Sequence, residues 1–161
     1  MRASYSYFIP TKLINLTKGC KSSESGSEDC PQTIALQLKA GTIIGELPPY
    51  EAFCLGGTSS VRGWGACELG VSKSYVEGTI EHRFPIWRML SGALFVDAGS
   101  DLGSQNDVPG KPGKLLQKSG SGYSLGGGVG IKTPIGPLRL DVASQDLSGD
   151  WRYTLGVGWK F

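Results

Sequence analysis

The segment WRYTLGVGWKF (residues 151–161) alternates between two kinds of side chain along its whole length. One face carries large apolar residues and the other carries small or polar residues. The apolar set is Trp151, Tyr153, Leu155, Val157, Trp159 and Phe161, and the other set is Arg152, Thr154, Gly156, Gly158 and Lys160. A tilted membrane-spanning β-strand needs roughly 9 to 11 residues and often has aromatic residues at both interfaces. The segment therefore predicts one strand of a transmembrane β-barrel.

The same two-residue period recurs upstream, and it predicts an all-β chain of about six or seven strands. In residues 75–86, Val76 and Ile80 share one face while Glu81 lies on the other. In residues 91–99, Asp97 is predicted to face the same side as Glu81. The other predicted strands are residues 33–44, 123–133 and 138–143, together with a single N-terminal strand drawn from residues 3–8 and 13–17, which Pro10 interrupts.

A soluble β-sandwich is the alternative fold, since its strands also alternate. The solvent faces of a sandwich normally hold many charges, whereas these faces hold glycine, threonine and isolated charges that suit a crowded barrel lumen. No apolar run approaches the roughly 20 residues of a membrane-spanning helix, and the N-terminus lacks the pattern of a secretory signal. The pattern thus favours an antiparallel membrane barrel.

Composition excludes several function classes. The 161 residues carry a net charge of +2 with scattered lysines and arginines, which argues against a nucleic-acid partner. Four cysteines without a C-x-x-C pair and a single histidine, His82, do not suggest a metal site. Cys20 and Cys30 flank a polar loop (residues 21–29) and could pair if oxidised, but we expect reduced thiols because nothing else indicates a disulfide scaffold.

No catalytic centre or cofactor site is expected either. Ser59 and Ser60 lack a plausible His/Asp partner, and the pair Gly56-Gly57 is not followed by the lysine, serine and helix of a phosphate loop. The chain is therefore predicted not to be an enzyme. Residues 100–122 are rich in Gly, Pro, Lys and Ser, and they predict a long, exposed and mobile loop.

The stretch LGGTSSVRGWG (residues 55–65) places a cation among glycines. Glycine permits left-handed and strained backbone, so this composition indicates a loop folded tightly on itself. Val61 and Trp64 supply apolar side chains that can pack and hold the loop in place. Arg62 supplies a guanidinium suited to carboxylates. A flexible glycine-rich surface loop is the competing interpretation.

Within this stretch, GGTSSVRGW (residues 56–64) resembles the G-G-x-x-S-V-R-G-aromatic loop of the outer-membrane-protein-85 superfamily, also called bacterial surface antigens. EHRFP (residues 81–85) and FVDAG (residues 95–99) resemble two strand motifs of that family, in the expected order. GSDLGS (99–104), KSGSGY (118–123) and TPIGPLRL (133–140) are similar to its plastid outer-envelope branch. The resemblance covers nearly the whole chain from Thr33 onward.

The resemblance implies that the loop folds back into the barrel lumen and that Arg62 pairs with Glu81 and Asp97 on the inner wall. The loop residues that match the family motif are Gly56, Gly57, Val61, Arg62, Gly63 and Trp64. The alternation independently allows both carboxylates on the polar face. The competing interpretation treats Glu81 and Asp97 as ordinary lumen-lining charges.

The resemblance also implies a function: insertion of barrel proteins into the chloroplast outer envelope, or transport of proteins across it, without a cofactor. The implied partners are membrane lipids, unfolded or partly folded polypeptides, and other barrel chains that complete the wall. The family's N-terminal polypeptide-transport repeat domains are absent from this sequence, so residues 1–161 are expected to form the C-terminal part of a larger barrel. A passive pore or accessory barrel without insertase activity is the alternative function.

Overall fold

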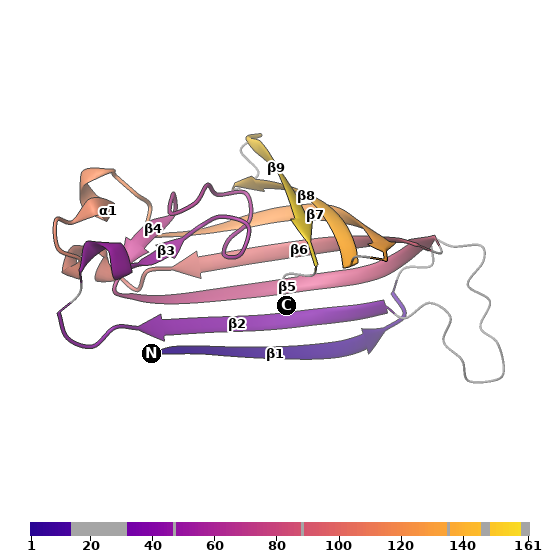
Figure 1. The fold of residues 1–161 in the computed structure, drawn as a ribbon, viewed down its shortest axis with the longest axis horizontal. Helices are drawn as coiled ribbons and strands as arrows, with labels where there is room; N and C mark the ends of the chain where they lie inside the picture. Colours follow the sequence, from indigo (N-terminus) through magenta and orange to yellow (C-terminus); the bar gives the residue numbers. More distant parts are fainter. Residues whose placement is uncertain (14–31, 47, 88, 135, 146–148, 159–161) are drawn as a thin grey trace.

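The computed structural model describes residues 1–13, 32–46, 48–87, 89–134, 136–145 and 149–158. Seven of the described strands form one antiparallel sheet in the order β1-β2-β5-β6-β7-β8-β9 (Figure 1). They are β1 (Arg2–Thr11), β2 (Gln32–Thr42), β5 (Ser74–Trp87), β6 (Leu90–Ser100), β7 (Ser121–Thr133), β8 (Gly136–Gln145) and β9 (Trp151–Val157). The predicted all-β antiparallel wall is confirmed, and within the described residues it is an open sheet with β1 and β9 at its edges.

A second, two-stranded sheet lies between β2 and β5 in the chain. It pairs β3 (Phe53–Leu55) with β4 (Gly70–Ser72), and the glycine-arginine loop connects the two strands. Figure 1 shows this hairpin and its loop lying across the middle strands of the main sheet. The remaining elements are the 3-10 helices η1 (Pro49–Glu51) and η2 (Ser104–Asp107) and the short helix α1 (Pro112–Leu115).

The strand boundaries differ most from the predicted ones at the two ends of the chain. β1 continues through Pro10, which is paired with Thr33 of β2, because an edge strand tolerates a missing backbone donor. β9 ends at Val157, and Gly158 follows it with a left-handed φ of 91°. Residues 14–31, which include most of the predicted segment 13–17 and the polar loop 21–29, lie outside the described residues, as do residues 159–161.

Residues 100–122 are more compact than predicted. The segment holds η2 and α1, and Val108 is 1% exposed. The Ser104 hydroxyl accepts a hydrogen bond from the Ser74 amide at 2.8 Å and lies 2.9 Å from the Ser74 carbonyl, to which it donates. Buried contacts therefore fold this connection against the end of β5, while most of its residues are exposed, as predicted.

The two faces of the main sheet are inverted relative to a water-soluble fold. Glu77, Glu81 and Asp97 are buried on the face that the loop covers. On the opposite face, Ile80 is 55% exposed and Leu94 is 52% exposed. A sandwich would cover this apolar face with a second sheet. The described sheet leaves it uncovered, as a barrel wall in lipid would.

Within the described ranges, no helix is both long and apolar enough to cross a membrane.

Replacing Leu94 by arginine tests which face contacts lipid. Leu94 lies near the middle of β6, where a charge facing lipid is most costly. For protein folded in lipid vesicles, the Leu94→Arg variant should therefore lower the free energy of unfolding by about 2–4 kcal/mol. Urea titration of vesicle-folded protein measures the change. The matched control is Thr154→Arg, on the covered face opposite Asp141, which should be nearly neutral. Equal effects at both positions would contradict the assignment of faces.

Candidate functional site

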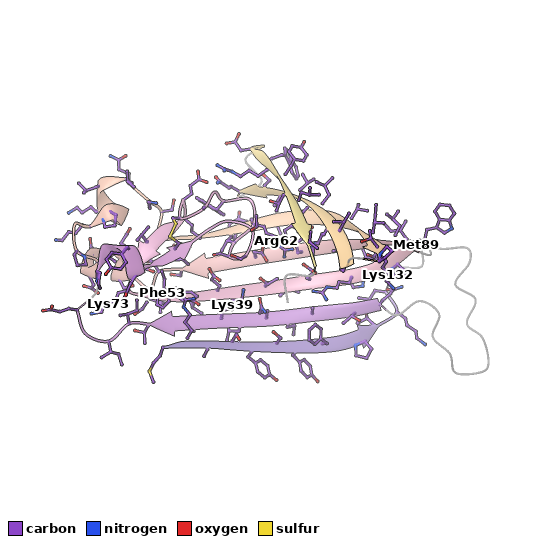
Figure 2. The ribbon with its side chains drawn as sticks, viewed as in Figure 1. Lys39, Phe53, Arg62, Lys73, Met89 and Lys132 are labelled. Atoms are coloured by element: carbon purple, nitrogen blue, oxygen red, sulfur yellow. A yellow bond between two sulfur atoms is a disulfide. The ribbon has the colours of Figure 1, made fainter. Side chains whose placement is uncertain are left out.

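The glycine-arginine loop is fixed against the polar face of the main sheet. Leu55, Val61 and Leu69 form a fully buried apolar cluster at its base, and Trp64 and Tyr75 pack against that cluster. Arg62 points from the loop towards the strands (Figure 2). The loop is therefore a packed element of the wall's interior and not a flexible surface segment.

Glycine is required at two turns of this loop. Gly56 has a φ of 104°, and a Cβ there would lie 2.5 Å from the carbonyl oxygen of Gly65. Gly63 has a φ of 90°, and a Cβ there would lie 3.2 Å from Ser124 Cβ and 3.3 Å from Ala143 Cβ. Left-handed backbone strains other residues. These two glycines thus let the loop close on itself and approach β7 and β8.

Arg62 makes a bidentate ion pair with Asp97. Its Nε lies 2.7 Å from Oδ2 and its Nη2 lies 3.0 Å from Oδ1, while the Arg62 backbone amide donates to Oδ2 at 3.1 Å. The guanidinium also stacks on Phe95, with its central carbon 3.4 Å from the ring centroid. Arg62 is only 2% exposed. A lysine could not reproduce this planar, forked contact.

Arg62 also reaches the second predicted carboxylate, because its Nη1 lies 2.8 Å from Glu81 Oε2. Burial alone would lower the pKa of Arg62, but the hydrogen bonds and charges of Asp97 and Glu81 raise it above its ordinary value. The arginine therefore stays charged. The structure places Arg62 between the two carboxylates that the sequence assigned to one face.

The ion pairs around Glu81 form a network that also includes Arg139 and Asp141 of β8 and Arg83 of β5. These three residues were not predicted from the sequence as part of the site. Arg139 donates from Nη1 and Nη2 to the two oxygens of Glu81 at 2.9 and 2.8 Å. Its Nε lies 2.6 Å from Asp141 Oδ1, and Arg83 Nε lies 2.7 Å from Glu81 Oε1. The alternation of residues 138–142 indicated that Arg139 and Asp141 share a face, but it did not indicate their distance from Glu81.

The complete cluster is balanced in charge. Its three guanidiniums belong to Arg62, Arg83 and Arg139, and its three carboxylates belong to Glu81, Asp97 and Asp141. A buried charge is costly unless it is paired and hydrogen-bonded. The balance explains how so many ionised groups remain buried inside one wall.

Further contacts tie the loop to strands on both sides of this cluster. Lys39 Nζ of β2 donates to the Ser59 carbonyl at 3.0 Å, and the Ser60 hydroxyl donates to Glu77 of β5. Trp64 Nε1 donates to the Tyr123 carbonyl of β7 at 3.2 Å. On the far side, Glu68 forms an exposed ion pair with Arg152 of the edge strand β9 at 2.9 Å. The loop therefore contacts each strand of the main sheet from β2 to β9.

A disulfide closes the base of the loop. Cys54 of β3 is bonded to Cys67, 13 residues along the chain, so the expectation of reduced thiols was wrong for this pair. The short β3–β4 pairing brings the two ends of the loop together, which sequence spacing could not show. The other predicted pair, Cys20 and Cys30, lies outside the described residues.

The described part of the chain shows no group of three or more His, Cys, Asp or Glu side chains arranged to hold a metal ion.

Comparison with known proteins places this geometry in a family context. Residues 1–161 match the Omp85 superfamily domain. The chain is similar to "Outer envelope protein 80, chloroplastic" of Arabidopsis thaliana, with 42% identity over 128 residues that cover 80% of this chain and 17% of that protein. "Outer envelope protein 39, chloroplastic" of Arabidopsis thaliana is 40% identical over 113 residues, covering 70% of this chain and 31% of that protein.

A third relative is "Protein TOC75, chloroplastic" of Oryza sativa subsp. japonica, which is 40% identical over 131 residues that cover 81% of this chain and 16% of that protein. The chain thus spans less than a third of the length of each of these three relatives.

The interaction free energy between Arg62 and Asp97 can be measured with a double-mutant cycle. Arg62→Ala should lower the free energy of unfolding by about 3–5 kcal/mol, because it leaves a buried carboxylate without its bidentate partner. Adding Asp97→Ala to that variant should cost much less than Asp97→Ala alone. Urea titration in lipid vesicles measures all three variants. Strict additivity of the two changes would show that the side chains do not interact.

The disulfide should hold the loop against the wall. In the Cys54→Ser/Cys67→Ser variant, amide hydrogen exchange of residues 56–69 should accelerate, because a link that closes a loop of this size is worth about 2–4 kcal/mol. Adding a dithiol reductant to the unmodified protein should give the same pattern, and it should leave the variant unchanged. If the reductant leaves exchange of the unmodified protein unaltered, the loop does not depend on the bond.

Proposed function

The chain belongs to the Omp85 superfamily, and we propose that it acts in the chloroplast outer envelope, in the insertion of β-barrel proteins into that membrane or the transport of proteins across it. The observation that carries this proposal is the fixed position of Arg62 between Asp97 and Glu81 on the covered face of the sheet. These ion pairs bring the glycine-arginine loop together with the two strand motifs, residues 81–85 and 95–99, in one buried cluster.

The proposed mechanism uses the open edges of the sheet. Within the described residues, β1 and β9 each have one hydrogen-bonded neighbour, so each presents backbone donors and acceptors along its other side. Such an edge can pair with an incoming extended strand by β-augmentation. The loop stiffens the wall behind the edges, and its Glu68–Arg152 contact reaches β9 itself.

The proposed partners follow from the two faces. The uncovered apolar face contacts membrane lipids, and the edges contact unfolded or partly folded polypeptides or further barrel strands that complete the wall. Pairing of strands requires neither a cofactor nor a covalent step. The proposed activity is accordingly that of a template and not of an enzyme.

A passive pore or accessory barrel is the competing function, because a wall of this construction could also surround a channel. A soluble binding module has less support, since the described sheet buries Glu81 and Asp97 and leaves Ile80 and Leu94 exposed. Assembly and conduction differ in one testable respect: assembly depends on a rigid interior behind the edges, whereas simple conduction does not.

Removing Arg62 should separate the two functions. In lipid vesicles that contain the chain, Arg62→Ala should slow the insertion of an unfolded β-barrel substrate by about tenfold or more, because the loop loses its bond to the wall. Ion conductance of the same vesicles should change little. The control is Lys132→Ala, which removes an exposed cation at the far end of β7, near Met89 (Figure 2). Equal loss of both activities, or of neither, would contradict the proposed role of Arg62.

A further inference from the structure

The uncovered face of the sheet has a hollow of about 480 Å³ that the charge network does not use. It lies over β1, β2, β5 and β6, and its lining is almost entirely apolar. The residues that shape it are Tyr5, Tyr7, Leu38, Gly78, Ile80 and Ala98.

The strand register shows how the lining residues are arranged across the uncovered face. Tyr5 lies opposite Leu38, Leu38 lies opposite Gly78, and Gly78 lies opposite Ala98, so these residues form one row across the uncovered face. The two smallest members of the row, Gly78 and Ala98, are neighbours, with Leu38 on one side of them and Tyr123 of β7 on the other. The next row includes Tyr7 and Ile80, which extend the walls along the strand direction.

Nothing in the described part of the chain requires glycine at position 78. Its φ is not left-handed, and an added Cβ would meet no atom within 4 Å. Gly126 differs, because a Cβ there would lie 2.5 Å from the ring of Phe95. Glycine in a strand interior weakens the strand and often marks a place where another molecule approaches closely. The space above Gly78 is thus open to a molecule outside this chain.

The position of the hollow identifies the chemistry of its occupant. It lies on the face that also exposes Leu94, Val129 and Leu140, opposite the face that holds Arg62. In the proposed membrane setting, the molecules that touch this face are lipids. Tyr5 and Tyr7 add ring faces with polar hydroxyl ends, a combination that suits the boundary between acyl chains and headgroups.

We propose that this hollow binds one acyl chain of a membrane lipid, with Gly78 and Ala98 as its floor and the rings of Tyr5 and Tyr7 as one wall. This inference rests on the proposed membrane location but not on a role in protein assembly. Because β1 is an edge strand, the bound lipid lies beside the edge at which a substrate strand would pair. The site therefore fixes a lipid next to the open edge of β1.

Photolabelling in vesicles tests the site. The full chain is folded into phosphatidylcholine vesicles that contain a tracer phosphatidylcholine with a diazirine on its acyl chain, and the adducts are located by mass spectrometry after illumination. We expect adducts at residues lining the hollow, and Gly78→Leu, which fills it, should reduce them about fivefold. Gly127→Leu adds the same side chain to the same face outside the hollow, opposite Leu94, and should leave them unchanged. Ala98→Leu fills the hollow from β6 and replaces Gly78→Leu if that variant does not fold.

Each alternative occupant gives a different result. Adducts spread evenly over the uncovered face and unaffected by either filling variant would overturn the site while leaving the membrane location intact. Loss of labelling at the hollow, together with chain-to-chain links formed by a separately added bifunctional cross-linker, would show that a second copy covers it and would also overturn the proposal. Failure to label any residue of the uncovered face would contradict the membrane location itself.

Discussion

The structure depends on the burial of one guanidinium between two carboxylates of neighbouring strands. Arg62 is attached to a loop, whereas Glu81 and Asp97 are attached to β5 and β6, so their contact requires the loop to lie on the inner face of the wall. Buried charges must be paired to be tolerated. The polar face of every neighbouring strand therefore turns towards the loop, and the apolar face is left uncovered in the described sheet.

The cluster behaves as a unit because its members share partners. Glu81 accepts from Arg62, Arg83 and Arg139, while Asp141 lies within ion-pair distance of both Arg62 and Arg139. The effects of substitutions at residues in one network do not add. The exposed Glu68–Arg152 pair stabilises the structure less than the buried ion pairs do, but it connects the loop to the edge strand β9. The loop thus connects the buried charge cluster on β5 and β6 to the edge strand β9.

The faces of the strands could be predicted from the sequence because a strand's side chains alternate with a period of two, which put Glu81 and Asp97 on one side. The β3–β4 hairpin could not, because three-residue strands are too short to show a period. The Cys54–Cys67 bond depends on that hairpin and was missed with it. Arg139 and Asp141 were visible as lumen-facing residues, but their approach to Glu81 depends on how far β8 curves around the sheet, which no local pattern encodes.

The most direct test is the separation of the Arg62 guanidinium from the Asp97 carboxylate in the membrane-embedded protein. Solid-state NMR of protein labelled with ¹⁵N-arginine and ¹³C-aspartate in lipid bilayers measures the dipolar coupling between the two groups, and Asp97→Asn assigns the signal. A coupling that corresponds to direct contact, as expected from the 2.7 Å between Nε and Oδ2, would support a loop fixed inside the wall. A folded protein in which Arg62 shows no coupling to Asp97 would contradict it.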